Sequence, residues 1–221
     1  MTDLRLVIFD VDGTLVDSQS HIVAAMTAAF GAEGRPVPAV PDILDVVGLS
    51  LPVAIGTLAP DLAPERAERM VDAYRKAFFD LRVGNAASPL YPGAVEALQA
   101  LAAADEVLLG IATGKSRRGL DHILEAHGIA HHFATIQVAD QHPSKPHPAM
   151  VLAALAETGV APANAVMIGD TEFDIEMGRA AGVRTIGVSW GYHPPERLSR
   201  ADGLVERFQA LPDMVARLWS A

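Results

Sequence analysis

The chain has 221 residues, half of them hydrophobic, and its 27 acidic and 17 basic side chains give a formal net charge of −10. This acidic balance argues against binding to nucleic acid or anionic membranes, which both need basic surface. The absence of cysteine excludes disulfides, thiolate zinc sites and a cysteine nucleophile; it suits a reducing compartment, so we expect a cytoplasmic protein. No apolar run reaches the roughly 20 residues of a membrane span, and we expect no signal peptide at the start.

Four short, continuous apolar runs predict strands that are buried on both faces of a sheet. They lie at 6–9, 107–112, 165–168 and 185–188. Helical patterns with regularly spaced apolar residues lie between the later runs, at 92–104, 116–127, 148–157 and 171–181. This alternation predicts an α/β fold, a doubly wound and mostly parallel sheet with helices on both faces.

Residues 16–87 interrupt the alternation. They contain helical patterns at 22–30, 41–47, 52–58 and 64–79, punctuated by prolines, and no convincing buried strand. Because about 70 residues are too many for an ordinary α/β connection, we predict an insertion. The predicted domains are an α/β core at 1–15 and 88–221 and a small all-helical cap at 16–87. The return linker would lie at 84–89, with hinges at 16–17 and 86–89.

Polar side chains gather where the predicted strands end, and one lysine lies between two prolines in a later loop. The candidates are Asp10, Asp12, Thr113, Gly114, Lys145, Asp170 and Asp174. In an open parallel sheet the carboxyl ends of the strands meet at one edge, where ligands bind. Taken singly, each residue has an ordinary explanation as a turn, a helix cap or a solvated lysine. Their joint placement favours a site.

Four converging carboxylates repel one another unless a cation offsets their charge. Oxygen ligands without His or Cys favour a hard ion, and we predict Mg²⁺. Thr113, Lys145 and the backbone amides of Gly114 and of the turn containing Asp10 and Asp12 are then candidates to bind a phosphoryl group. One aspartate can attack phosphorus while a second moves the proton.

Four motifs, in this order, resemble those of the haloacid dehalogenase-like (HAD) phosphohydrolases. They are FDVDGTLVDS at 9–18, IATGK at 111–115, SKPHP at 144–148 and IGDTEFD at 168–174. The helical insertion after the first motif resembles the cap of the phosphoglycolate phosphatase-like subgroup. The resemblance implies a Rossmann-type core with a helical cap. It also implies a Mg²⁺-dependent phosphatase that acts on a small phosphorylated metabolite.

The resemblance also implies roles for individual residues. Asp10 would be the nucleophile and form an aspartyl-phosphate, and Asp12 would protonate the leaving oxygen and then activate water. The Asp10 carboxylate, the Asp12 main-chain oxygen and Asp170 would ligate Mg²⁺.

The remaining motif residues would bind or support. Thr113 and Lys145 would bind the phosphoryl group, with Lys145 also offsetting the charge of Asp10. Asp174 would hold Asp170 and Lys145 in place without itself ligating the ion.

Several alternatives stay open or are disfavoured at this point. Dehalogenase members of the family lack the second acid, so the presence of Asp12 disfavours dehalogenation. Phosphonate hydrolysis needs a Schiff-base lysine in the cap, and it is disfavoured because Lys76 is a poor candidate for that lysine. A catalytically silent binding protein need not keep all four of the residues Asp10, Asp12, Lys145 and Asp170. The open alternatives are a pyrophosphatase and, as the main rival, a sugar-phosphate mutase of the β-phosphoglucomutase type.

The segment 47–52 bears on this rivalry. Mutase-like members carry an arginine after a Gly-x-Ser segment, whereas here Leu51 follows Ser50. We expect Leu49, Ser50 and Leu51 to face the site, to shape specificity and to favour a leaving group without a second strong anion. Four cap arginines could also reach the site, although a solvated helix face is the simpler explanation: Arg66, Arg69, Arg75 and Arg82.

The other features receive no site role. We assign none to the histidines and interpret residues 190–192 as rim or core packing. The expected partner is a small phosphorylated substrate, and a monomer is expected, with a dimer left open.

Overall fold

The computed structural model describes residues 4–84 and 87–220. Within these ranges, six strands form one parallel sheet in the order β3-β2-β1-β4-β5-β6. The strands are β1 (Arg5–Phe9), β2 (Val107–Thr113), β3 (Phe133–Val138), β4 (Ala165–Gly169), β5 (Arg184–Val188) and β6 (Gly203–Val205). The chain extends the sheet first on one side of β1 and then on the other, so the predicted doubly wound α/β fold is confirmed.

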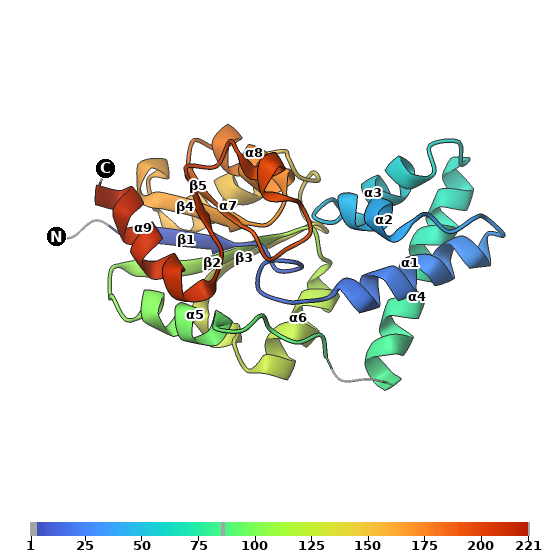
Figure 1. Ribbon diagram of the computed structural model, residues 1–221, viewed down its shortest axis with the longest axis horizontal. Coiled ribbons are helices and arrows are strands. Elements are labelled where there is room, and N and C mark those ends of the chain that lie inside the picture. The colour runs from blue at the N-terminus through green and yellow to red at the C-terminus, as the bar shows by residue number, and fades with distance from the viewer. Residues whose placement is uncertain (1–3, 85–86, 221) are drawn as a thin grey trace.

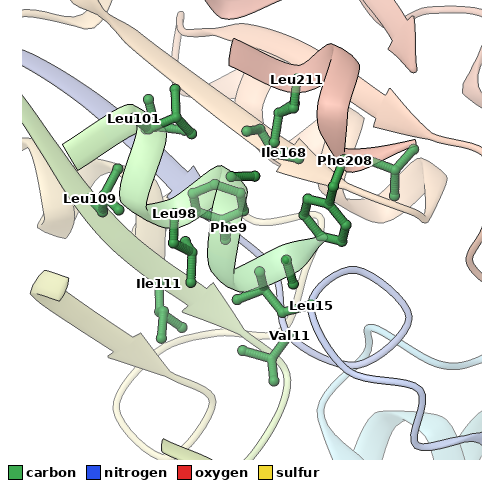
Figure 2. Packing of buried hydrophobic residues seen from close by; sticks show 14 of the residues in the cluster. Phe9, Val11, Leu15, Leu98, Leu101, Leu109, Ile111, Ile168, Phe208 and Leu211 are labelled. Atoms are coloured by element: carbon green, nitrogen blue, oxygen red, sulfur yellow. The ribbon is translucent and has the colours of Figure 1, made fainter. Parts of the chain in front are cut away.

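β1 is buried on both faces because its side chains alternate between two apolar clusters. Val7 and Phe9 belong to one cluster, and Leu6 and Ile8 belong to the other. Figure 2 shows Phe9 packed among side chains of the first cluster, with Phe208 nearby. This double burial places the residue that follows Phe9 at the centre of the sheet's carboxyl edge.

Helices cover both faces of the sheet (Figure 1). The first cluster lies under α5 (Ala94–Ala102), α6 (Arg117–His127) and α9 (Leu211–Ser220), and the second under α7 (Ala149–Thr158) and α8 (Glu172–Ala180). Short 3₁₀ turns complete the core at Ala130–His132, Pro162–Asn164, Pro195–Leu198 and Phe208–Ala210.

The predicted core helices form with local signals at their ends. Ser116 Oγ accepts a hydrogen bond from Gly119 N at the start of α6, and Gly128 ends that helix with φ of 65°. Such a left-handed residue favours glycine, which carries no Cβ. The sequence patterns did not predict β3, β6 or α9.

Four further helices form the helical insertion, as we call residues 19–84. They are α1 (Gln19–Ala32), α2 (Val40–Asp45), α3 (Leu51–Leu58) and α4 (Pro64–Gly84). They pack on their own apolar cluster, which includes Phe30, Ile55 and Met70, separate from the two clusters of the sheet. Figure 1 shows the insertion beyond one end of the sheet, with α1 and α4 alongside each other. In the described ranges, no helix has both the length and the apolar character needed to cross a membrane.

The two connections to the insertion run side by side. Asp17 N donates to Pro89 O at 2.9 Å, and Val16 and Leu90 form an antiparallel bridge. Residues 85 and 86, which belong to the predicted linker, lie outside the described residues. The predicted hinges and domain boundaries stay predictions.

Candidate active site

Asp10 lies at the carboxyl end of β1 and is 1% exposed. Its backbone amide donates to Ile168 O at 2.9 Å, which holds this turn against β4. Lys145 Nζ lies 2.7 Å from Asp10 Oδ1 and 2.6 Å from Asp174 Oδ1. The lysine, itself buried, therefore joins a carboxylate from the first motif to one from the last.

Asp170 completes a cluster of three buried acids. Thr14 Oγ1 donates to its Oδ1 and the Tyr192 amide donates to its Oδ2, both at 2.8 Å. Asp10, Asp170 and Asp174 each offer a carboxylate oxygen, and the three oxygens lie within 4.8 Å of one another. The structure thus brings together acids that are far apart in the sequence.

The electrostatics of this cluster are unfavourable for charged carboxylates. Burial raises the pKa of Asp10 from its usual 3.8 to about 6; Lys145 lowers this pKa, while Asp174 and Asp12 raise it further. Burial also raises the pKa of Asp170 well above its usual value, and the neighbouring Asp174 and Asp10 add to the rise. Burial opposes the charged form of Lys145, but Asp10 and Asp174 outweigh it, so the lysine pKa is raised.

These acids fit a divalent cation. Asp10 Oδ1 is buried and accepts no hydrogen bond of good geometry from the described part of the chain, although the Lys145 ammonium is close. One ammonium offsets only part of the charge of three carboxylates. Close oxygen ligands, among which Asp10 and Asp170 have raised pKa values, are suited to a hard ion such as Mg²⁺.

Backbone packing holds the acids in place. A Cβ on Gly191 would lie 2.1 Å from Asp170 Cβ, and one on Gly169 would lie 2.2 Å from Asp174 Cγ. Asp174 also closes a capping box with Thr171 at the start of α8, where the Thr171 amide donates to Asp174 Oδ2 at 3.0 Å. The acids therefore have little freedom to move apart.

Asp12 is held by two other side chains. Ser18 Oγ donates to Asp12 Oδ1 at 2.5 Å, and Lys115 Nζ lies 2.8 and 2.7 Å from Oδ1 and Oδ2. Tyr192 reaches the same place, since its hydroxyl lies 3.2 Å from Ser18 Oγ.

A cavity of about 630 Å³ separates these residues from the helical insertion. Its core side includes Asp10, Asp12, Thr113 and Gly114. Its opposite side is mainly apolar and comes from the insertion: Ile22, Met26, Val46, Val47, Leu49, Leu51, Tyr74 and Phe78, with Ser50 among them.

The loop between α2 and α3 touches the core directly. Ser50 N donates to Ser144 Oγ at 2.8 Å. A Cβ on Gly114 would lie 2.4 Å from Gly48 O and 2.8 Å from Leu49 O, so only glycine lets the two backbones come this close. The insertion is therefore closed onto the core at this point.

Comparison with known proteins identifies the family. The model of the haloacid dehalogenase-like hydrolases matches residues 7–188. The chain belongs to this family.

Individual proteins are similar to this chain over most of their length. The chain is 38% identical over 200 residues to a Dickeya dadantii protein named "Probable phosphatase IndB", covering 89% of this chain and 86% of that protein. It is 30% identical over 213 residues to a phosphoglycolate phosphatase of Vibrio cholerae, covering 91% and 92%. The crystal structure of a hydrolase from Pseudomonas syringae superposes with a TM-score of 0.85 at 27% identity, covering 96% and 98%.

The structure places the predicted residues of this HAD-like hydrolase in two groups. Asp10, Lys145, Asp170 and Asp174 form the buried charged cluster, whereas Asp12, Thr113 and Gly114 line the cavity with Asp10. Leu49, Ser50 and Leu51 line the opposite side of the cavity.

The cap arginines differ from one another. Arg66 and Arg69 pair with Glu33 inside the insertion, at 2.8 and 2.9 Å. Arg75 lines the cavity and lies 3.6 Å from Asp72. The side chain of Arg82 lies outside the described residues.

Sequence reasoning missed several groups around the site. Thr14, Ser18 and Lys115 stand inside the first and second motifs, so the motifs were the signal that could have identified them. The interpretation of residues 190–192 as packing was incomplete, because the Tyr192 amide binds Asp170. His193 was assigned no role, yet it accepts from Glu172 N and contacts Asp45 O of the insertion, each at 3.2 Å.

Proposed function

We propose that this chain is a Mg²⁺-dependent phosphatase that hydrolyses a small phosphorylated metabolite through an aspartyl-phosphate on Asp10. One observation carries the proposal: Asp10 lines the cavity, is buried, and lies beside a lysine ammonium and two further carboxylates. The names of the relatives support phosphatase activity, and those from Vibrio support the phosphoglycolate phosphatase type.

In the first step Asp10 attacks phosphorus, the bond to the leaving oxygen breaks, and Asp12 gives that oxygen a proton. In the second step Asp12 takes a proton from water, the water oxygen attacks phosphorus, and the bond to Asp10 breaks. Asp12 suits both steps because it is near Asp10 on the cavity side and is not fully buried.

The other residues bind and orient. Thr113 Oγ1 and the amide of Gly114, which line the cavity at the end of β2, would donate to phosphoryl oxygens, and Lys145 would offset the charge of Asp10. Asp10, the Asp12 main-chain oxygen and Asp170 would hold Mg²⁺, with Asp174 behind them. When bound, the ion neutralises charge that develops on the phosphoryl group.

The helical insertion would act as the cap that excludes bulk water. The apolar loop that contains Leu49 and Leu51 favours a phosphorylated compound whose remaining part lacks a second strong anion, which counts against phosphoglycolate, whereas Arg75 on the same cavity favours an anionic group. Leu51 lines the cavity, so the position at which mutase-like members carry arginine is apolar here. Hydrolysis is therefore favoured over phosphate transfer between sugar positions. The monomeric state and the cytoplasmic location stay predictions.

The proposal is tested with p-nitrophenyl phosphate and a panel of phosphorylated metabolites, with Mg²⁺ and with EDTA. We expect turnover only with the metal, and a loss of about a thousandfold or more in Asp10→Asn, because the amide cannot form the phosphoenzyme. Asp61→Asn, on the outer surface of the insertion, is the matched control and should keep full activity. Full activity in Asp10→Asn, or in EDTA, would contradict the proposal.

A further inference from the structure

Lys115 is a nearly buried cation to which the mechanism above gives no task. Its Nζ contacts both carboxylate oxygens of Asp12, and the two side chains are only 8% and 14% exposed. By contrast, the ion pair of Lys76 with Asp80 has side chains that are 78% and 57% exposed. Shielded pairs are weakened little by solvent, so the contact with Lys115 restricts Asp12 far more than a surface pair would.

The surroundings of Lys115 strengthen this restriction. Its ammonium lies 5.0 Å from the centre of the Phe78 ring, which belongs to α4 of the insertion. A cation over an aromatic face is attracted to it. On the other side, Ser18 Oγ donates to Asp12 Oδ1. Asp12 is thus held between Ser18, in the connection that leads into the insertion, and a lysine that contacts the insertion.

We propose that Lys115 is a positioning residue that holds the Asp12 carboxyl group in the orientation needed for proton transfer. The proposal rests on the phosphatase function proposed above. Proton transfer requires the donor oxygen within hydrogen-bond reach of the leaving oxygen, so small displacements of Asp12 reduce its efficiency. Lys115 acts through Asp12 and not on the substrate.

Two substrates of similar shape separate this role from phosphate binding. The phenolate released from phenyl phosphate needs a proton more than the p-nitrophenolate released from p-nitrophenyl phosphate, because phenol is the weaker acid. The value of kcat/KM reports the steps up to departure of this group. In Lys115→Met we expect kcat/KM to fall about tenfold for phenyl phosphate and only about twofold for p-nitrophenyl phosphate. Lys115→Arg should recover much of the loss, and Lys76→Met should change neither value.

A double-substitution cycle tests whether Lys115 works through Asp12. In an Asp12→Asn background, Lys115→Met should change kcat/KM by less than about twofold. The proposal is wrong if Lys115→Met lowers kcat/KM as much in the Asp12→Asn background as in the wild type. It is also wrong if Lys115→Met alone lowers kcat/KM equally for the two substrates. Lys115→Gln serves in the same measurements if the methionine variant does not fold.

The activity of the wild-type protein separates the proposed phosphatase function from the proposed role of Lys115. If the wild-type protein hydrolyses neither phosphate ester, the proposed function is wrong. If it hydrolyses both but Lys115→Met shows no preference between them, only the role of Lys115 is wrong.

Discussion

At the scale of single residues, the charged cluster contains more buried carboxylates than the protein's own lysine can neutralise. Asp10, Asp170 and Asp174 are almost fully buried, and Lys145 supplies one positive charge to them. Burial makes an unpaired carboxylate costly, and the raised pKa values of Asp10 and Asp170 express that cost. A bound cation would neutralise the remaining carboxylate charge. Metal binding should therefore raise the free energy of unfolding as well as the activity.

The first prediction concerns pH and Mg²⁺. Because the pKa of Asp10 is raised to about 6, the metal-free folded protein holds more protons than the unfolded chain between about pH 4 and 6. Its stability should therefore fall as the pH rises through this range. Mg²⁺ must displace the proton at pH 5 but not at pH 8, so we expect binding to be about tenfold weaker at pH 5.

Thermal unfolding with and without Mg²⁺ at the two pH values measures this effect. The increase in Tm on adding Mg²⁺ should be larger at pH 8. Asp170→Asn is expected to lose most of the increase, and Asp61→Asn to keep it. An equal increase at pH 5 and pH 8 would show that Asp10 does not exchange a proton for the ion.

At the scale of elements, helix ends carry the site. α8 begins directly after the loop that holds Asp170, and its capping box involves Asp174, which also contacts Lys145. α6 begins after the second motif with Ser116 as an ordinary cap. The cap of α6 therefore serves helix formation alone. The cap of α8 serves helix formation and also holds a member of the charged cluster.

The second prediction compares these two caps. Ser116→Ala should cost about 1 kcal/mol of unfolding free energy, the usual loss for an N-cap. Thr171→Val should cost more, because Thr171 Oγ1 also donates to Asp174 Oδ2 at 2.7 Å and that buried oxygen would lose a donor. Urea unfolding curves give both values. An equal or smaller loss in Thr171→Val would mean that the bond to Asp174 contributes nothing.

At the scale of the whole molecule, the insertion contacts the core beside the candidate active site. Arg197 of the core pairs with Asp45 at the end of α2 and with Glu172 at the start of α8. His193, 2% exposed, lies between the same two segments, and burial lowers its pKa. These contacts favour the closed position of the insertion.

The third prediction follows from this contact. Asp45→Asn removes one charge of a partly exposed pair, so the closed position should be favoured about two- to fivefold less. We expect KM to rise by a similar factor with little change in kcat, and amide hydrogen exchange in α2 to become faster. Asp61→Asn breaks the pair with Arg35, and both of these residues belong to the insertion. This variant should change neither KM nor the exchange rate in α2. Unchanged exchange in α2 would show that this pair does not hold the insertion closed.

Much of this fold follows from local patterns along the chain. The runs around Phe9 and Ile168 predicted central strands, and Ser116 and Thr171 marked helix starts that the structure shows as N-caps. These signals act over a few residues, so they are readable without tertiary contacts. β3 was missed because polar residues interrupt its apolar sequence. Buried Thr135 and Gln137 both donate to Glu157 Oε2, a partner on α7 that no local pattern announces.

Local patterns were sufficient to predict the α/β class, a helical insertion, and a set of carboxylates and a lysine at the carboxyl edge of the sheet. Parallel strands with polar residues at their ends bring such groups together whatever the details of packing. Three contacts became apparent only in the folded chain: Lys115 with Asp12, the Tyr192 amide with Asp170, and Arg197 with Asp45. These pairs lie about 20 to 150 residues apart in the chain, so their contact depends on how the loops and the insertion pack.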